Sequence, residues 1–159
     1  MTTAPSSDTP TRKRLKPGER RAQILQTLAA MLQEPGNERI TTAALAKRLQ
    51  VSEAALYRHF ASKAQMFEGL IDFIESTVFG LINQINEREA DGRARAARIV
   101  AMVLQFGEKN PGMTRVMVGD ALVFEHDRLQ QRMNQFLERI ESTLRQCLRP
   151  VTASSATPT

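Results

Sequence analysis

The sequence predicts an all-α fold, and three observations support that class. Apolar residues recur at spacings of three and four along most of the chain, which is the period of amphipathic helices. No stretch alternates apolar and polar residues as a half-buried strand does. Capping and breaking residues, such as Ser52, Ser62 and Asn110-Pro111, divide the pattern into seven helical segments.

The composition is that of a globular protein in a reducing compartment. Apolar residues make up 42% of the 159 residues and charged residues 25%, which is not the composition of a disordered chain. Cys147 is the only cysteine, so no intramolecular disulfide can form. The chain has neither an apolar run long enough to span a membrane nor an N-terminal signal pattern. We therefore expect a cytoplasmic protein with no membrane partner.

The positive charge is concentrated at the N-terminal end. The net charge is +5, and residues 1–65 hold 11 Lys and Arg against five Asp and Glu, whereas residues 66–159 hold 11 against 12. A basic segment joined to a near-neutral one favours a nucleic-acid partner at the basic end. Residues 1–16 are predicted to be a disordered basic arm, which either grips a DNA backbone or minor groove or is only a solvated leader.

Three short helices follow the arm. An apolar stripe begins after Pro17-Gly18, and Pro35-Gly36-Asn37 ends it. A second helix opens at Thr41 or Thr42, and Ser52 caps a third helix that extends to about residue 60. The tight turn between the second and third helices gives a helix-turn-helix pattern. The inward residues of these two helices are predicted to be Leu45, Ala46, Leu49, Leu56 and Phe60.

A long fourth helix begins at a capping box. The Ser62 side chain is expected to accept from the amide of Gln65, and the Gln65 side chain to reach back to the cap. The apolar stripe of this helix keeps a period of 3.6 residues for five turns. The stripe consists of Phe67, Leu70, Ile71, Ile74, Val78, Leu81, Ile82 and Ile85.

Three more helices complete a predicted body, residues 71–149. The fifth spans roughly residues 93–106 and is apolar on several sides, so we expect other helices to surround it. Gly107 is predicted to end the fifth helix in a left-handed conformation, and Asn110-Pro111 to begin the sixth. The seventh carries a nearly heptad stripe suited to a coiled coil: Leu129, Met133, Phe136, Ile140, Leu144 and Cys147.

The chain is predicted to leave the helical pattern at Pro150. A proline lacks the amide donor that continues a helix, so we expect it to end the seventh helix. The following residues are small and polar, and residues 150–159 are predicted to be a disordered tail.

Signatures of catalysis are missing from the sequence. Neither a dinucleotide-binding glycine motif, nor a P-loop, nor a nucleophile elbow occurs. His59, His126 and Cys147 lie far apart and have no metal-ligand spacing, and Cys147 falls on an apolar stripe. We therefore expect neither an enzyme nor a cofactor or metal.

The helix-turn-helix concentrates the side chains that can bind DNA. A short helix fits the major groove, and its outward side chains reach base edges and phosphates. Arg58 can contact phosphate or guanine, Tyr57 can donate to phosphate, and Lys63 offers a second backbone anchor. A merely polar surface is the alternative interpretation. The candidate DNA-binding residues are Thr41, Thr42, Ser52, Glu53, Ala54, Tyr57, Arg58, His59 and Lys63.

Two stretches here resemble a known family. Thr-Thr-Ala-Ala-Leu-Ala-Lys-Arg-Leu, followed by Val-Ser-Glu-Ala-Ala-Leu-Tyr-Arg-His-Phe-Ala-Ser-Lys, is similar to the DNA-binding domain of TetR-type regulators. This resemblance assigns residues 17–70 to that domain. The resemblance continues beyond this domain. Two further stretches are similar to the TetR-type proteins that act as nucleoid occlusion factors: Phe-Gly-Glu-Lys-Asn-Pro-Gly-Met-Thr-Arg at 106–115 and Ala-Leu-Val-Phe-Glu-His-Asp-Arg-Leu-Gln at 121–130.

The resemblance implies a function and two partners. Such factors bind palindromic chromosomal sites as homodimers, associate with the nucleoid and regulate cell division negatively. They engage the C-terminal tail of the tubulin-like division protein FtsZ and prevent ring assembly over DNA. The positions that match the family's FtsZ site are Phe73, Leu104, Gly107, Lys109 and Asn110.

The residues add limited support for a partner site, and the sequence departs from the family at one end. Phe73 lies roughly 100° from the centre of the fourth helix's stripe, so it either packs on another helix or binds a partner.

TetR-type proteins dimerise largely through two C-terminal helices. The sequence ends after the seventh helix, so we expect a truncated body that lacks these two helices. A homodimer of this chain would then have to form without them.

Two other functions compete with this hypothesis. A ligand-responsive TetR-type repressor needs a cavity with convergent polar groups, and the fourth and fifth helices offer few candidates beyond Asn83 and Gln105. A helical interaction module without DNA leaves the basic N-terminal third unexplained.

Overall fold

The computed structural model describes residues 15–36 and 39–154, and within them the all-α prediction is confirmed. The predicted arm therefore lies outside the described residues except for Leu15 and Lys16, as do residues 155–159 of the predicted tail. The elements are α1 (Pro17–Gln33), α2 (Thr42–Leu49), α3 (Glu53–Tyr57), α4 (Lys63–Arg88), α5 (Gly92–Lys109), α6 (Pro111–Met117), the 3-10 turn η1 (Asp120–Leu122) and α7 (Asp127–Ser154).

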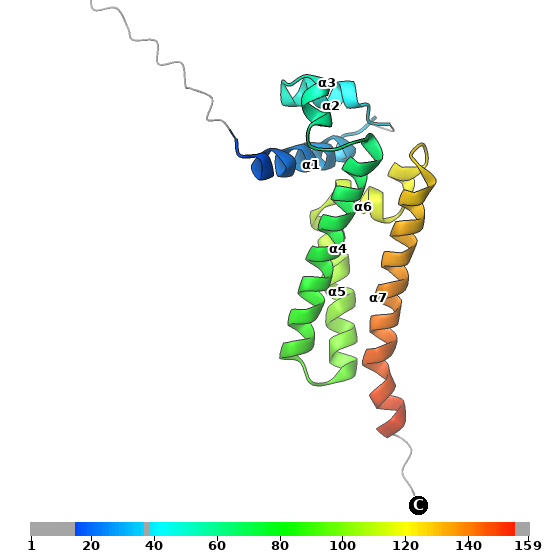
Figure 1. Cartoon of the computed structure of the whole chain (residues 1–159). Helices are drawn as coiled ribbons and strands as arrows, with labels where there is room; N and C mark the ends of the chain where they lie inside the picture. The colour runs from blue at the N-terminus through cyan, green and yellow to red at the C-terminus, as the bar shows by residue number, and fades with distance from the viewer. Residues whose placement is uncertain (1–14, 37–38, 155–159) are drawn as a thin grey trace, which may run out of the picture.

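The helices form a small domain at one end of an elongated bundle. Helices α1, α2 and α3 cluster at the N-terminal end, and α4 leaves them to run beside α5 and α7 (Figure 1). Helix α6 lies at the junction and packs on α1. One continuous apolar core extends from Ile24 and Leu28 in the small domain to Met133 and Phe136 in the bundle. The domain and the body thus share a core.

Local capping explains where several helices begin. The side-chain oxygens of Thr41, Ser52 and Ser62 accept from backbone amides three residues later, at 3.1–3.2 Å. The expected capping box at Ser62 is only half right, because the Gln65 side chain accepts from the amide of Ala61 and not from that of the cap. The turn after α2 places Gln50 in the left-handed region, at φ 57°.

Helix ends follow the sequence pattern less well. Helix α3 stops at Tyr57, one turn before the predicted end near residue 60, because the amides of His59 and Phe60 both bond the Leu56 carbonyl in a turn. Gly107 is not a left-handed terminator, since α5 continues to Lys109. The Thr114 hydroxyl donates to the Gly107 carbonyl at 2.6 Å. Asn110 precedes α6 as predicted, but its amide donates to the Phe106 carbonyl of α5 instead of capping α6.

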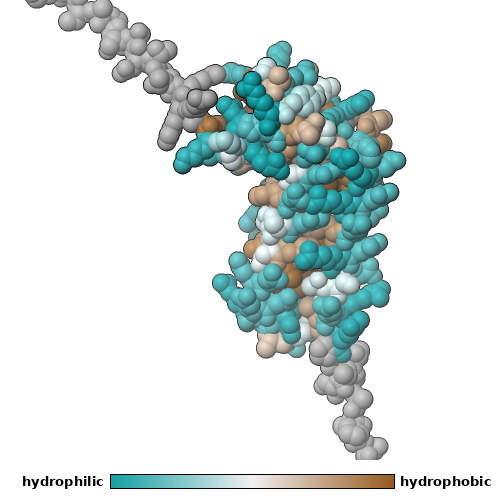
Figure 2. Space-filling model, viewed as in Figure 1, coloured by the Kyte–Doolittle hydropathy of each residue, from teal (hydrophilic) through white to brown (hydrophobic). Residues whose placement is uncertain are grey.

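Two expectations about the body are wrong. Helix α5 is not surrounded by other helices, because Val100 is 45% exposed and Leu104 68% exposed. Apolar patches accordingly reach the surface of the body between hydrophilic side chains (Figure 2). Helix α7 does not end at Pro150 but continues to Ser154, since a proline removes one hydrogen bond and kinks a helix without always stopping it. The predicted tail is therefore helical over residues 150–154.

Close backbone contact holds α6 against α1. A Cβ atom on Gly112 would overlap the carbonyl oxygen of Ala29 and lie 3.0 Å from its carbonyl carbon. Glycine therefore allows the two helices to approach this closely. The Arg115 guanidinium donates to the Leu32 carbonyl near the end of α1 at 2.7 Å, which satisfies one of the last acceptors of that helix.

A half-exposed ion network joins α4 to α7. Arg132 pairs with Asp72 and with Glu75, the latter at 3.1 Å, and Arg128 pairs with Glu68 at 2.5 Å. Burial lowers the pKa of Arg132, but hydrogen bonds and charges from both carboxylates outweigh it and leave the pKa above its ordinary value. The network fixes the register of the two helices along one edge of the bundle.

Candidate nucleic-acid interface

Helix α3 presents a polar surface and buries an apolar one. Leu56 and Phe60 are 0% and 2% exposed, as predicted, whereas Tyr57 is 45% exposed and Arg58 lies at the surface. Ser52, Glu53 and Ala54 are exposed on the same turn, and His59 is half-buried. The outward side chains of α3 thus form one continuous surface, next to the N-terminus of α2.

Several of the candidate hydroxyls already hold the local backbone. Thr41 and Ser52 accept hydrogen bonds as helix caps, and each hydroxyl can still donate to a phosphate. The Thr42 hydroxyl donates to the Glu53 carboxylate at 3.3 Å, which ties the start of α2 to the start of α3. The two helix starts are therefore held side by side, as a helix-turn-helix requires.

Lys63 has an acidic partner that the sequence pattern did not predict. Its ammonium pairs with the Glu125 carboxylate at 2.7 Å, and the side chains of the two residues are 23% and 8% exposed. Glu125 lies 62 residues later, just before α7. A phosphate that bound Lys63 would have to share it with this carboxylate.

We predict that Glu125→Gln strengthens DNA binding by Lys63. The change removes the negative charge that offsets Lys63, so the salt dependence of log K should steepen by about 0.9 for each bound subunit, as for one added phosphate contact. The measurement is fluorescence anisotropy with duplex DNA at several salt concentrations. Glu89→Gln is the control, because it removes the same charge from the Arg98 pair near the α4–α5 turn. Equal slopes for the two variants would mean that Lys63 does not contact DNA.

The candidate partner residues come from α4 and from the C-terminal part of α5, which leads into α6. Phe73 is 48% exposed, and Leu104 and Lys109 are also exposed, whereas Gly107 and Asn110 are half-buried at the end of α5. Phe73 also lines an apolar crevice of about 130 Å³, whose other walls come from α1 and α6. No local sequence pattern indicates these walls, because α1 and α6 are brought together only by the fold. The other lining residues are Ala22, Leu25, Gln26, Leu70 and Met113.

The described residues hold no group of three or more His, Cys, Asp or Glu side chains that could bind a metal ion. Cys147 is buried on α7, as its place in the stripe predicts. The His126 imidazole accepts from the Arg128 amide at 3.1 Å, so this side chain stabilises the start of α7. Among the helices described, none is long and apolar enough to cross a membrane.

Comparisons with known proteins agree with this arrangement. A family model described as bacterial regulatory proteins of the tetR family matches residues 24–70. A second, described as a tetracyclin repressor-like, C-terminal domain of the SlmA-like type, matches residues 91–155. A TetR-family transcriptional regulator from Bordetella parapertussis has a similar structure, with a TM-score of 0.67 at 19% identity over 86% of this chain and 70% of that chain.

Curated relatives are more similar in sequence. The nucleoid occlusion factor SlmA of Alteromonas mediterranea is 56% identical over 135 residues, which cover 85% of this chain and 69% of the relative. The protein of the same name from Vibrio cholerae is 56% identical over 131 residues, which cover 82% of this chain and 67% of the relative. The similarity thus includes both the small domain and the body.

Proposed function

Because this chain belongs to the TetR-type family of the nucleoid occlusion factor SlmA, a family of DNA-binding regulators and not of enzymes, we propose that it prevents cell division over the chromosome. In this proposal the protein binds palindromic sites, associates with the nucleoid and inhibits assembly of FtsZ. The observation that carries the DNA part is the surface of α3, where Tyr57 and Arg58 are exposed above the buried Leu56. A helix presented in this way can enter the major groove.

The proposed FtsZ site consists of Phe73 on α4 and the candidate residues of the C-terminal part of α5. An exposed phenylalanine that lines an apolar crevice suits an apolar side chain of a peptide, and the exposed Lys109 at the end of α5 suits an acidic one. An empty apolar cavity of about 150 Å³ is large enough to bind benzene, so a crevice of about 130 Å³ accommodates a single side chain.

A homodimer is part of the proposal, because a palindromic site needs two recognition helices. Helix α7 supports it with exposed apolar side chains that flank Leu144, at the edge of the buried stripe. Leu137 and Leu148 are each 45% exposed, and Leu144 is half-buried between them. Spacings of seven and four place the three residues on one face, where a second copy could pack. Sedimentation of the full chain would test this; a monomer at micromolar concentration would contradict it.

We predict that Phe73→Ala spares DNA binding and abolishes inhibition of FtsZ. Truncation of a hot-spot aromatic residue at the centre of an interface costs about 2 kcal/mol or more, so affinity for an FtsZ tail peptide should fall by at least about 30-fold. The measurements are anisotropy of the labelled peptide and light scattering of FtsZ polymers. Phe124→Ala is the matched control, because Phe124 is 61% exposed but lies outside the proposed site, before α7. FtsZ polymers that stay sensitive to Phe73→Ala would place the site elsewhere.

A further inference from the structure

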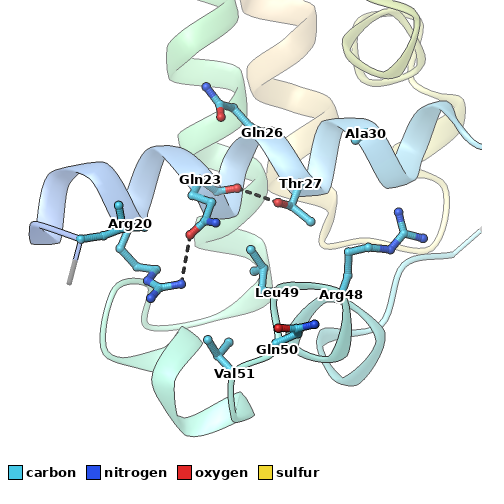
Figure 3. Close-up of a pocket in the computed structure, with 10 residues that line it drawn as sticks. Arg20, Gln23, Gln26, Thr27, Ala30, Arg48, Leu49, Gln50 and Val51 are labelled. Carbon is cyan, nitrogen blue, oxygen red and sulfur yellow. Dashed lines mark hydrogen bonds between the residues drawn. The ribbon is translucent and has the colours of Figure 1, made fainter. Parts of the chain in front are cut away.

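An open trough runs between α1 and the α2–α3 turn, and the proposed function does not yet use it. Two hollows of about 700 and 600 Å³ share Leu15, Arg20 and Val51, so they form one continuous depression. Figure 3 shows Arg20 and Gln23 of α1 across the first hollow from Gln50 and Val51. The second hollow continues along α3 towards His59.

The lining of the trough is cationic. Neither hollow is lined by an aspartate or a glutamate, and the cationic side chains come from both sides. Arg48 is neutralised by Glu34 at 2.5 Å, whereas Arg20 donates to the uncharged Gln23 amide at 3.0 Å and keeps its full charge. The only acidic residue of α1, Glu19, accepts from the Lys16 backbone amide and does not line the trough. The cationic and titratable lining residues are Lys16, Arg20, Arg48, Arg58 and His59.

The trough lies along one flank of the recognition helix. At 100° per residue, Ala55 points about 200° away from Glu53 around α3. Glu53 accepts from Thr42, so the start of α2 lies on its side of α3, while Ala55 and His59 line the trough on the other side. A helix in the major groove has a phosphate backbone on each flank. Thr42 therefore marks one flank, and the trough marks the opposite one.

We propose that this trough binds the sugar–phosphate backbone of duplex DNA on the flank of α3 opposite Thr42. Lys16, the N-cap of α1, and Arg20, on its first turn, are the phosphate ligands, and neither reads a base. The inference rests on the proposed DNA binding and extends it, because Lys16 and Arg20 belong to α1 and lie outside the helix-turn-helix, although Arg58 at the end of α3 also lines the trough. It adds affinity without sequence preference and lengthens the DNA segment that the protein covers.

The first test is the salt dependence of DNA binding by the double variant Lys16→Gln, Arg20→Gln. Loss of two phosphate contacts should reduce the steepness of log K against log salt by about 1.8 for each bound subunit. Affinity should fall in the same proportion for a duplex with a captured chromosomal site and for a random duplex. The control is Arg98→Gln, Arg145→Gln, which removes the same charge from exposed positions on α5 and α7. Thermal unfolding by circular dichroism checks that both double variants fold.

The second test shortens the DNA. Trimming the flanks of the captured site should weaken the wild-type protein and leave the Lys16→Gln, Arg20→Gln variant unaffected, because the lost phosphates are those that the variant no longer binds. If the Lys16→Gln, Arg20→Gln variant has the same salt slope as the control variant, the proposal for the trough is overturned. The proposed function would still stand in that case if Arg58→Ala weakens DNA binding. A variant that keeps the slope but loses the FtsZ tail peptide would assign the trough to an acidic peptide and also overturn it. Failure of the wild-type protein to bind DNA would instead contradict the proposed function.

Discussion

Arg58→Ala should lower the affinity for a specific DNA site by roughly 5- to 150-fold for each recognition helix. Arg58 is exposed at the end of α3, where its guanidinium can reach a guanine edge or a phosphate. Loss of a base contact of this kind costs about 1–3 kcal/mol, which corresponds to that range. Because a palindrome is read by two helices, the effect on a homodimer should be about twice as large in free energy. An electrophoretic shift assay with a captured site measures it.

The control for this prediction is Arg98→Ala, which removes the same side chain from an exposed position on α5. Tyr57→Ala is the companion variant, because Tyr57 is 45% exposed on the same surface of α3. If Arg58 contacts a base, its loss should weaken the specific site more than a random duplex; if it contacts only phosphate, both should weaken alike. Wild-type affinity in both the Arg58 and Tyr57 variants would remove α3 from the DNA interface.

Gly112→Ala should destabilise the protein, although alanine is the better helix former. The added Cβ would overlap the Ala29 carbonyl oxygen, and a backbone atom cannot move aside as a flexible side chain can. Overpacking of this kind costs about 1–3 kcal/mol and occasionally more, and each kcal/mol lowers the melting temperature by roughly 2–4 °C in a protein of this size. The variant should also loosen α6 from α1 and so change the crevice that Met113 and Leu25 line.

Gly80→Ala provides the matched control for the stability measurement. Gly80 lies inside α4, is exposed, and has nothing within 4 Å of the position of an added Cβ. Alanine there should raise stability by about 0.5–1 kcal/mol, because it reduces the freedom of the unfolded chain. The two variants should therefore shift the melting temperature in opposite directions. A Gly112→Ala protein that melts at or above the wild-type temperature would contradict the close contact between α1 and α6.

The sequence predicts helix starts better than helix ends, for a physical reason. A cap is a local interaction, and Ser52 and Ser62 accept from amides only three residues away. Whether a glycine ends a helix depends on what surrounds it. Gly107 stays helical in a region where its carbonyl accepts from Thr114 of the next helix, and a pattern confined to α5 cannot show this contact.

Burial on one side of a helix can be predicted, but the partners on the other side cannot. The periodicity of α3 was enough to predict that Leu56 and Phe60 point inward. The pairing of Lys63 with Glu125 joins residues 62 positions apart, so no local pattern contains it. The prediction that other helices surround α5 is wrong at Val100 and Leu104, which are exposed. An apolar composition does not show which helices are available to cover α5.

A genome-wide map of the DNA fragments that the protein captures in cells tests the central claim most directly. The claim is that α3 reads palindromic sites distributed over the chromosome and that the bound protein inhibits FtsZ there. It predicts many dispersed sites that share a palindrome and are sparse near the replication terminus. One or two promoter sites would contradict it, and would instead indicate a ligand-responsive TetR-type repressor for which the FtsZ site around Phe73 has no role.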